Sequence, residues 1–343
     1  MSDADAGDVP RLDGYVDKWV ERQVRRLRPS TLKSYRQLIR AYLQPHLGDR
    51  RLGELDRRLL EDVYARLLAC GGVNGKPLSP RTVEYVHQLL HTILQDALLD
   101  GLVTANPARS ARPPRHDPDA IELDDEPEIW TVEQATAFLR FVDDHPWRAL
   151  WHLAVGSGAR RGELLGLRWR DVDLEAARVD IRRALSVIDG VPRLLGTKHA
   201  NRRVVHVGDS VVDALRRHEQ QQQRRRDGAD VWQDRWGLVF TGDDGRPIDP
   251  MAVTVAFREL VRCAPVPVVR FHDLRHFHAT VLIGAGVAPK VVSRRLGHTS
   301  MEVTMDVYGH VLPSMDGEAA DRLDVALRAA GALQSAISSR SPR

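Results

Sequence analysis

The sequence places one tyrosine, Tyr308, after Tyr85, and the other five at or before that position. A phenol can act as a nucleophile that becomes covalently bound to its substrate. Its ordinary pKa of about 10 requires that it lose its proton during the attack or lie in a cationic pocket. Taken alone, a tyrosine near a helix is more often a half-buried amphipathic side chain. The residues around Tyr308 must decide between these interpretations.

Residue types that bind anions come before Tyr308. His272 and Arg275 are three residues apart, so in a helix they face one side and could meet the same anion. His298 follows in a Leu-Gly-His sequence, ten residues before Tyr308. These neighbours favour a phosphate-handling role for the tyrosine.

Two more basic segments lie farther upstream. A glycine turn at Gly158 comes two positions before Arg160, where backbone and side chain can both reach a phosphate. Lys198 falls in a predicted connection between strands, followed by Arg202 and Arg203. A guanidinium offers a rigid fork of donors to phosphate oxygens. The general bias of the chain towards arginine, however, is explained more simply by the composition of a GC-rich genome.

Together these segments resemble the boxes of the tyrosine recombinase family, which includes phage integrases and Xer-type recombinases. The similar segments are, in chain order, 157–160 with 163–164, 197–198 with 201–203, 272–276, 296–298 and 305–310. Each box alone is a weak signal, but all six key positions occur in the order and spacing of the family. The resemblance is strong over residues 130–327 and looser over residues 11–107.

The resemblance implies a DNA strand transfer through a covalent 3′-phosphotyrosine. The implied catalytic residues are Tyr308, Arg160, Lys198, His272, Arg275 and His298. The two arginines would neutralise the non-bridging phosphate oxygens, and one of these oxygens would also accept a hydrogen bond from His298. His272 would accept the phenolic proton, and Lys198 would protonate the leaving 5′ oxygen. Glu163 and His276 are expected to support these groups without touching the phosphate.

No cofactor and no metal are expected. Covalent capture conserves the energy of the phosphodiester bond, so a 5′ hydroxyl can reverse the step without a nucleotide. His276, His278 and His310 lie near the predicted site residues, but their spacing follows no standard ligand pattern. A metal centre is therefore the less favoured interpretation of these histidines.

A basic helix is predicted near the N-terminus. Apolar residues recur at helical spacing from Leu32 to Leu43, with Ser30 in the capping position. The other face carries three residues that we expect to contact the DNA backbone, Lys33, Arg36 and Arg40. A solvated helix face is the alternative, and on its own it is the more common one. Arg202 and Arg203 are expected to be further DNA contacts.

The predicted fold is mainly α with a small antiparallel β-sheet, an α+β class. A second N-terminal helix is predicted to begin at Ser79, whereas the sequence after Trp169 alternates and contains the turn pair Asp189-Gly190. Prolines and acidic residues indicate a linker before the second domain. With the resemblance, the expected parts are a disordered N-terminus 1–10, a SAM-like core-binding helical domain 11–107, a linker 108–128, a catalytic domain 129–333 and a tail 334–343. The two domains would form a clamp around DNA.

The expected partner is double-stranded DNA with attachment sites. By resemblance, residues 317–333 would form a helix that is exchanged between protomers of a homotetramer on DNA, although a helix packed on its own domain has the same pattern. A DNA-bending or directionality factor is a further expected type of partner. No segment reaches the roughly 18 apolar residues of a membrane span. No signal sequence is recognised, and two cysteines form no disulfide framework. A cytoplasmic location is expected.

Within the family, a phage or mobile-element integrase is the favoured interpretation. The long predicted hairpin 179–207 favours it over an Xer-type resolution recombinase. Few residues precede the helical domain, which predicts a simple integrase without an arm-site-binding domain. A type IB topoisomerase has related tyrosine chemistry but differs around His298 and Tyr308. A catalytically silent DNA-binding regulator on the same fold is the alternative from another class, and the intact set of six residues argues against it.

Overall fold

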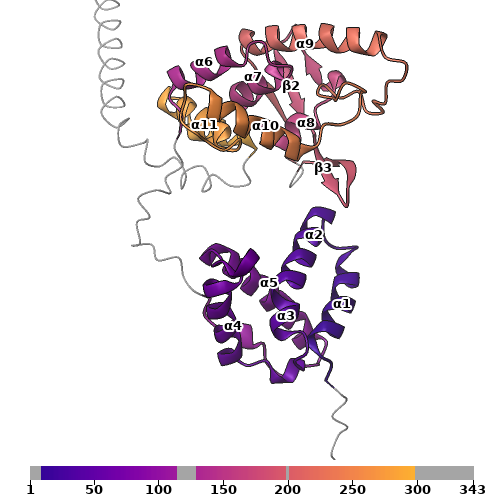
Figure 1. The fold of residues 1–343 in the computed structure, drawn as a ribbon, viewed down its shortest axis with the longest axis vertical. Helices are drawn as coiled ribbons and strands as arrows, with labels where there is room; N and C mark the ends of the chain where they lie inside the picture. Colours follow the sequence, from indigo (N-terminus) through magenta and orange to yellow (C-terminus); the bar gives the residue numbers. More distant parts are fainter. Residues whose placement is uncertain (1–8, 114–128, 198–200, 298–343) are drawn as a thin grey trace, which may run out of the picture. The chain divides into compact units, whose positions relative to one another are not determined.

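The computed structural model describes residues 9–113, 129–197 and 201–297 of the chain. The chain forms two compact units, residues 1–125 and 126–343, each with its own hydrophobic core. Figure 1 shows a helical first unit and a second unit in which helices surround short strands. The predicted class, mainly α with a small antiparallel sheet, is confirmed. The finer domain boundaries stay a prediction.

The described part of the first unit contains helices and no strand. Its α-helices are α1 (Leu12–Gln23), α2 (Pro29–Leu38), α3 (Gln44–Leu47), α4 (Arg57–Cys70) and α5 (Pro80–Leu99), and its shorter turns are η1 (Ile39–Leu43), η2 (Leu52–Glu54), η3 (Val73–Gly75) and η4 (Pro107–Arg109). The helix predicted to begin at Ser79 is α5: the Ser79 side chain accepts from the backbone N–H of Thr82, and Pro80 takes the first helical position.

The predicted basic helix is present, but its start differs from the expectation. α2 begins at Pro29, so Ser30 lies within the first turn instead of capping it. Proline is favoured there because its missing N–H needs no partner. The helix then widens into the π-helical turn η1 before α3, with the N–H of Gln44 bonded to the carbonyl of Ile39. Pro45 explains the widening, because it has no N–H and its ring would clash with a carbonyl four residues earlier.

Two small antiparallel sheets lie among the helices of the second unit. The strands are β1 (Val172–Asp173), β2 (Arg178–Ile181), β3 (Arg183–Ile188), β4 (Val191–Gly196) and β5 (Arg203–His206). One sheet has the order β1-β2-β5, and β3 and β4 form a separate hairpin that points away from the helices of the unit (Figure 1). The hairpin turns at Asp189 and Gly190, whose φ angles of 51° and 76° are those that a tight two-residue turn requires.

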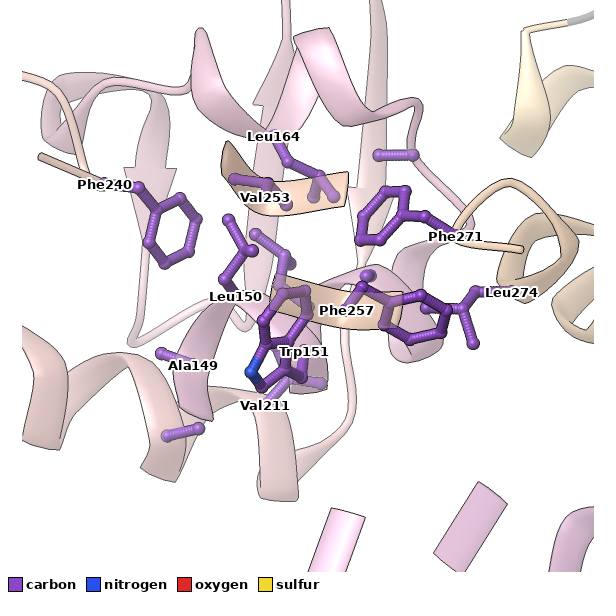
Figure 2. Close-up of a cluster of buried hydrophobic side chains, with 14 of the residues drawn as sticks. Ala149, Leu150, Trp151, Leu164, Val211, Phe240, Val253, Phe257, Phe271 and Leu274 are labelled. Carbon is purple, nitrogen blue, oxygen red and sulfur yellow. The ribbon is translucent and has the colours of Figure 1, made fainter. Parts of the chain in front are cut away.

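Aromatic side chains from distant segments form the centre of the second core (Figure 2). The α-helices of this unit are α6 (Val132–Phe141), α7 (Arg148–Ser157), α8 (Arg161–Leu165), α9 (Asp209–Asp227), α10 (Pro250–Cys263), α11 (Asp273–Gly284) and α12 (Pro289–Leu296), and η5 (Trp169–Asp171) is a short turn. The ring of Trp151 in α7 lies 5.8 Å from that of Phe257 in α10 and 6.1 Å from that of Phe271 before α11, between centroids. This packing fixes α7 against the start of α11. The predicted site residue Arg160 follows the end of α7, and His272 and Arg275 lie at the start of α11.

Candidate active site

The end of α7 is pressed against two other helices. Gly158 ends the helix with a φ of 62°, in the left-handed region that favours glycine. A Cβ at this position would lie 2.7 Å from Leu296 of α12 and 2.8 Å from His278 of α11. Glycine therefore allows the close approach that brings the next turn, with Arg160, towards the end of α12.

Arg160 caps α8 and is partly open to solvent. Its backbone N–H donates to Glu163 Oε2 at 2.8 Å, and its Nη1 donates to Glu163 Oε1 at 3.1 Å. Its Nη2 reaches the carbonyl of Gly297 at 3.3 Å, and 34% of the side chain is exposed. The neighbouring Arg161 instead donates to the hydroxyl of Thr254 on α10. Of the two arginines, Arg160 is thus the one directed at the chain just before His298.

Arg275 is buried between the same two turns. Its Nη1 donates to the carbonyl of Gly158 at 2.8 Å, and its Nη2 donates to the carbonyl of Leu296 at 2.7 Å. The side chain is therefore fixed from both sides. Arg160 and Arg275, which are 115 positions apart in the sequence, meet where α7 and α12 both end.

His272 lies at the start of α11 and is exposed on one side. Partial burial, followed by the charges of His276, Arg275 and Arg160, lowers its pKa to about 4. The rings of His272 and His276 meet edge to face with centroids 5.4 Å apart. Burial also lowers the pKa of His276. At neutral pH the His272 imidazole is therefore uncharged, and a neutral imidazole can accept a proton.

Glu163 is the carboxylate around which the arginines gather. Its side chain is only 4% exposed, yet its pKa is lowered: burial alone would raise it, but hydrogen bonds and charge from Arg203 and then Arg160 outweigh that effect. Arg203 donates from Nη1 and Nη2 to the two oxygens at 3.1 and 2.7 Å. The acid expected to support Arg160 thus also binds an arginine from β5.

The two arginines that the sequence offered as DNA contacts differ in their surroundings. The Arg202 side chain is 59% exposed and pairs with Asp180 at 2.9 Å. The Arg203 side chain is 5% exposed and is fully engaged with Glu163 and with the carbonyl of Arg295. A buried guanidinium paired in this way is not presented to a DNA backbone, so the expectation for Arg203 is corrected to an internal contact.

Arg295 is a part of the site region that the sequence did not indicate. It donates from Nε to His278 Nε2 at 2.9 Å and from Nη2 to the carbonyls of Gly156 and His206 at 3.1 and 2.7 Å. It therefore ties α12 to the end of α7 and to β5. No sequence signal distinguishes it from the adjacent Arg294, which is exposed.

Three of the predicted catalytic residues, Lys198, His298 and Tyr308, lie outside the described residues, as do residues 317–333. The segments that lead to them are described. β4 ends at Gly196 and β5 begins at Arg203, so Lys198 belongs to their connection. The chain leaves α12 through Gly297, whose φ is 67°. Arg160, Arg275 and Glu163 converge on this exit.

The three basic residues predicted to contact DNA in the first unit, Lys33, Arg36 and Arg40, lie on α2 and η1. Arg36 and Arg40 are exposed and Lys33 is half-buried.

Within the described ranges no group of three or more His, Cys, Asp or Glu side chains could hold a metal ion. None of the helices in those ranges is long and apolar enough to cross a membrane.

Comparison with known families places the chain. The profile of the phage integrase family matches residues 129–315, and that of the phage integrase N-terminal SAM-like domain matches residues 12–68. The first match covers more than half of the sequence, so the chain belongs to the phage integrase family. It is a tyrosine recombinase, an enzyme of site-specific DNA recombination.

Its relatives include both branches considered above. The chain is 27% identical over 329 residues to a XerC-like tyrosine recombinase of Caldanaerobacter subterraneus, covering 91% of this chain and 82% of the relative. It is 23% identical over 302 residues to the ICEBs1 integrase of Bacillus subtilis, covering 87% and 78%. It is 25% identical over 323 residues to the integrase of Mycobacterium phage D29, covering 93% and 79%.

Solved structures share the fold. The Tn1549 transposon integrase in complex with a circular intermediate DNA aligns with a TM-score of 0.71 at 21% identity, covering 87% of this chain and 94% of that one. A lambda integrase tetramer bound to a Holliday junction aligns with a TM-score of 0.64 at 16% identity, covering 88% and 78%.

Proposed function

We propose that this tyrosine recombinase is a phage or mobile-element integrase that cuts and rejoins DNA attachment sites through a 3′-phosphotyrosine. The residues proposed to act on the scissile phosphate are Tyr308, Arg160, Lys198, His272, Arg275 and His298. The observation that carries the proposal is the meeting of Arg160 and Arg275 at the carbonyls of Gly297 and Leu296, immediately before His298. Arg160, whose side chain is 34% exposed, can reach an anion beside this turn, and the buried Arg275 adds fixed positive charge behind it, where the charge of the phosphate grows in the transition state.

The charge state of His272 is compatible with the proton transfer proposed for it. Because the pKa of His272 is lowered to about 4, its imidazole is neutral at pH 7 and can accept the phenolic proton of Tyr308. Because His272 stays unprotonated between pH 8 and 6, its titration should not change the cleavage rate in that range. In the proposal, Lys198 protonates the departing 5′ oxygen, and His298 donates to a non-bridging oxygen.

The assembly is proposed from the relatives. One neighbour in fold is a tetramer bound to a Holliday junction. For this chain we propose a homotetramer on DNA, in which a C-terminal helix from residues 317–333 is exchanged between protomers. The SAM-like domain, residues 11–107, and the catalytic domain, residues 129–333, would enclose DNA, with Lys33, Arg36, Arg40 and Arg202 on its backbone. We place the reaction in the cytoplasm, with an accessory DNA-bending or directionality factor.

The test is capture of the covalent intermediate. The full chain is incubated with nicked candidate attachment DNA, and an adduct is expected that withstands denaturation and is lost in Tyr308→Phe. An adduct that survives this change would overturn the assignment of the nucleophile. Relaxation of supercoils without site preference would point instead to a topoisomerase, and resolution of paired sites in one molecule to the Xer-type role.

A further inference from the structure

Glu163 divides one carboxylate between two arginines. Oε1 accepts from Nη1 of Arg160 and from Nη1 of Arg203, both at 3.1 Å. Oε2 accepts from the backbone N–H of Arg160 at 2.8 Å and from Nη2 of Arg203 at 2.7 Å. Because the carboxylate is almost completely buried, these donors must compensate its charge in place of water.

The sharing is unequal. Arg203 engages both oxygens with its two terminal nitrogens, the two-point geometry in which a guanidinium binds a carboxylate best. The guanidinium of Arg160 makes a single bond to Glu163, at 3.1 Å, and one to a carbonyl, and about a third of its side chain is exposed. Arg160 is thus held at one edge, and among the described residues its other donors have no partner.

We propose that Arg203 is a positioning residue for Arg160: by engaging both oxygens of Glu163, it prevents the Arg160 guanidinium from closing onto that carboxylate and keeps it available to the scissile phosphate. The inference rests on the proposed function. Without Arg203, a buried carboxylate would have Arg160 as its remaining cationic partner. Arg160 would then bind both oxygens of Glu163, and its guanidinium would no longer be available to the phosphate.

Arg203 is also connected to the other parts of the site. Its Nε donates to the carbonyl of Arg295 at 2.7 Å, at the end of α12. A Cβ on Gly297 would lie 2.9 Å from Arg203 Nη1, so the chain leading to His298 passes directly over this guanidinium. Arg203 begins β5, the strand that follows the connection containing Lys198. Its side chain therefore links β5 to the turn of Arg160 and to the end of α12.

The first test is a double-mutant cycle on adduct formation with a nicked substrate at saturating protein. Arg203→Met should slow the reaction about 10²-fold, the size of effect seen when one transition-state donor is lost. In a Glu163→Gln background the same change should alter the rate by less than about threefold, because a neutral amide no longer attracts Arg160. The double variant should therefore react faster than Arg203→Met alone. Independent losses that multiply in the double variant would overturn the inference.

Two controls separate positioning from folding. Arg178→Met removes an exposed arginine that pairs with Asp173 on the outer part of the same sheet, and it should leave the rate unchanged. Thermal unfolding shows whether each variant is folded. If Arg203→Met does not fold, Glu163→Gln is compared with the double variant, whose core lacks the unpaired carboxylate. A further large loss of rate in that comparison contradicts the inference, and equal rates support it.

A second readout needs no DNA. Phenylglyoxal modifies accessible arginines, and peptide mass spectrometry gives the rate at Arg160. Modification of Arg160 should be slower in Arg203→Met than in the wild type and should recover in the double variant. Equal reactivity of Arg160 in the wild type and in Arg203→Met would overturn the inference. If the wild type forms no adduct, the proposed function fails, while this measurement still decides the relation between Arg203 and Arg160.

Discussion

The arginines of the basic helix in the first unit and those around Glu163 in the second unit have opposite surroundings. Arg36 and Arg40 are exposed along α2 and η1, where salt and water screen their charge. Arg203 and Arg275 are buried, and each donates to groups that the fold places opposite it. The same residue type is therefore an exposed charge in one unit and part of a fixed internal frame in the other.

The largest expected effect on stability comes from Arg203, compared with its neighbour Arg202. Arg203→Met should lower the free energy of unfolding by about 3–5 kcal/mol, because it leaves the buried Glu163 carboxylate without its main partner. Arg202→Met should change it by less than about 1 kcal/mol, because the Arg202 side chain is largely exposed and Asp180 keeps Arg182 as a partner. Urea unfolding of both variants measures the difference. Similar small losses would show that the Glu163 pair is not an internal frame.

A second prediction concerns Gly297, in the turn before His298. Gly297→Ala should lower stability by about 1–2 kcal/mol, because it places a Cβ in left-handed backbone and against the Arg203 guanidinium. The matched control is Gly284→Ala in α11, where a Cβ would have open space and alanine favours the helix. Thermal unfolding should rank Gly297→Ala below the wild type and Gly284→Ala at or above it. The reverse order would contradict the close approach.

A third prediction concerns the buried histidine His152. Neither ring nitrogen of His152 has a hydrogen-bond partner among the described residues, and burial, followed by the charge of Arg148, lowers its pKa from 6.5 to about 4. The unfolded chain therefore binds this proton first as pH falls, so stability is lost from about pH 6.5 down to about pH 4. His152→Leu should raise stability at pH 7 by about 1 kcal/mol and reduce its loss between pH 7 and 5. Unfolding curves at the two pH values test this, and an unchanged pH dependence would count against it.

The basic helix should show the smallest effect on stability. Replacing Lys33, Arg36 and Arg40 together by glutamine should leave unfolding unchanged within about 0.5 kcal/mol, because surface changes of this kind rarely matter more. If all three contact phosphates, the slope of log binding constant against log salt should become less negative by about 0.9 for each. Fluorescence anisotropy with duplex DNA across a salt series measures the slope. An unchanged slope would mean that this face is solvated and makes no DNA contact.

Much of the fold could be predicted from local patterns. The helix beginning at Pro80 and the hairpin turn at Asp189-Gly190 follow from capping and turn chemistry, which depend on a few adjacent residues. The start of the basic helix at Pro29 was missed because Ser30 offered an equally good local signal. The π turn before Pro45 could have been anticipated, since proline removes a donor within a helical pattern.

The partners of the site residues could not be predicted in the same way. Arg202, just before β5, and Arg203, its first residue, are adjacent and identical in type, yet one pairs with Asp180 and the other with Glu163. Which face meets Glu163 depends on the register of β5 against β2 and on the placement of α8. Arg295 likewise acquires its three partners from α7, α11 and β5, none of which is near it in the sequence.

The kind of chemistry could be predicted from the sequence, because the types and spacing of the residues in its boxes are sufficient to resemble a tyrosine recombinase. The main helices could be predicted as well, because periodicity and caps are local. Which arginines are internal and which are exposed depends on how the chain packs, and the sequence did not show it. Burial and ion pairing depend on contacts between segments far apart in the chain, and the energy of a charge changes greatly with those contacts. Arg160 was predicted to bind the scissile phosphate and Arg203 to contact DNA, and the structure makes them a partly exposed and a buried partner of the same carboxylate.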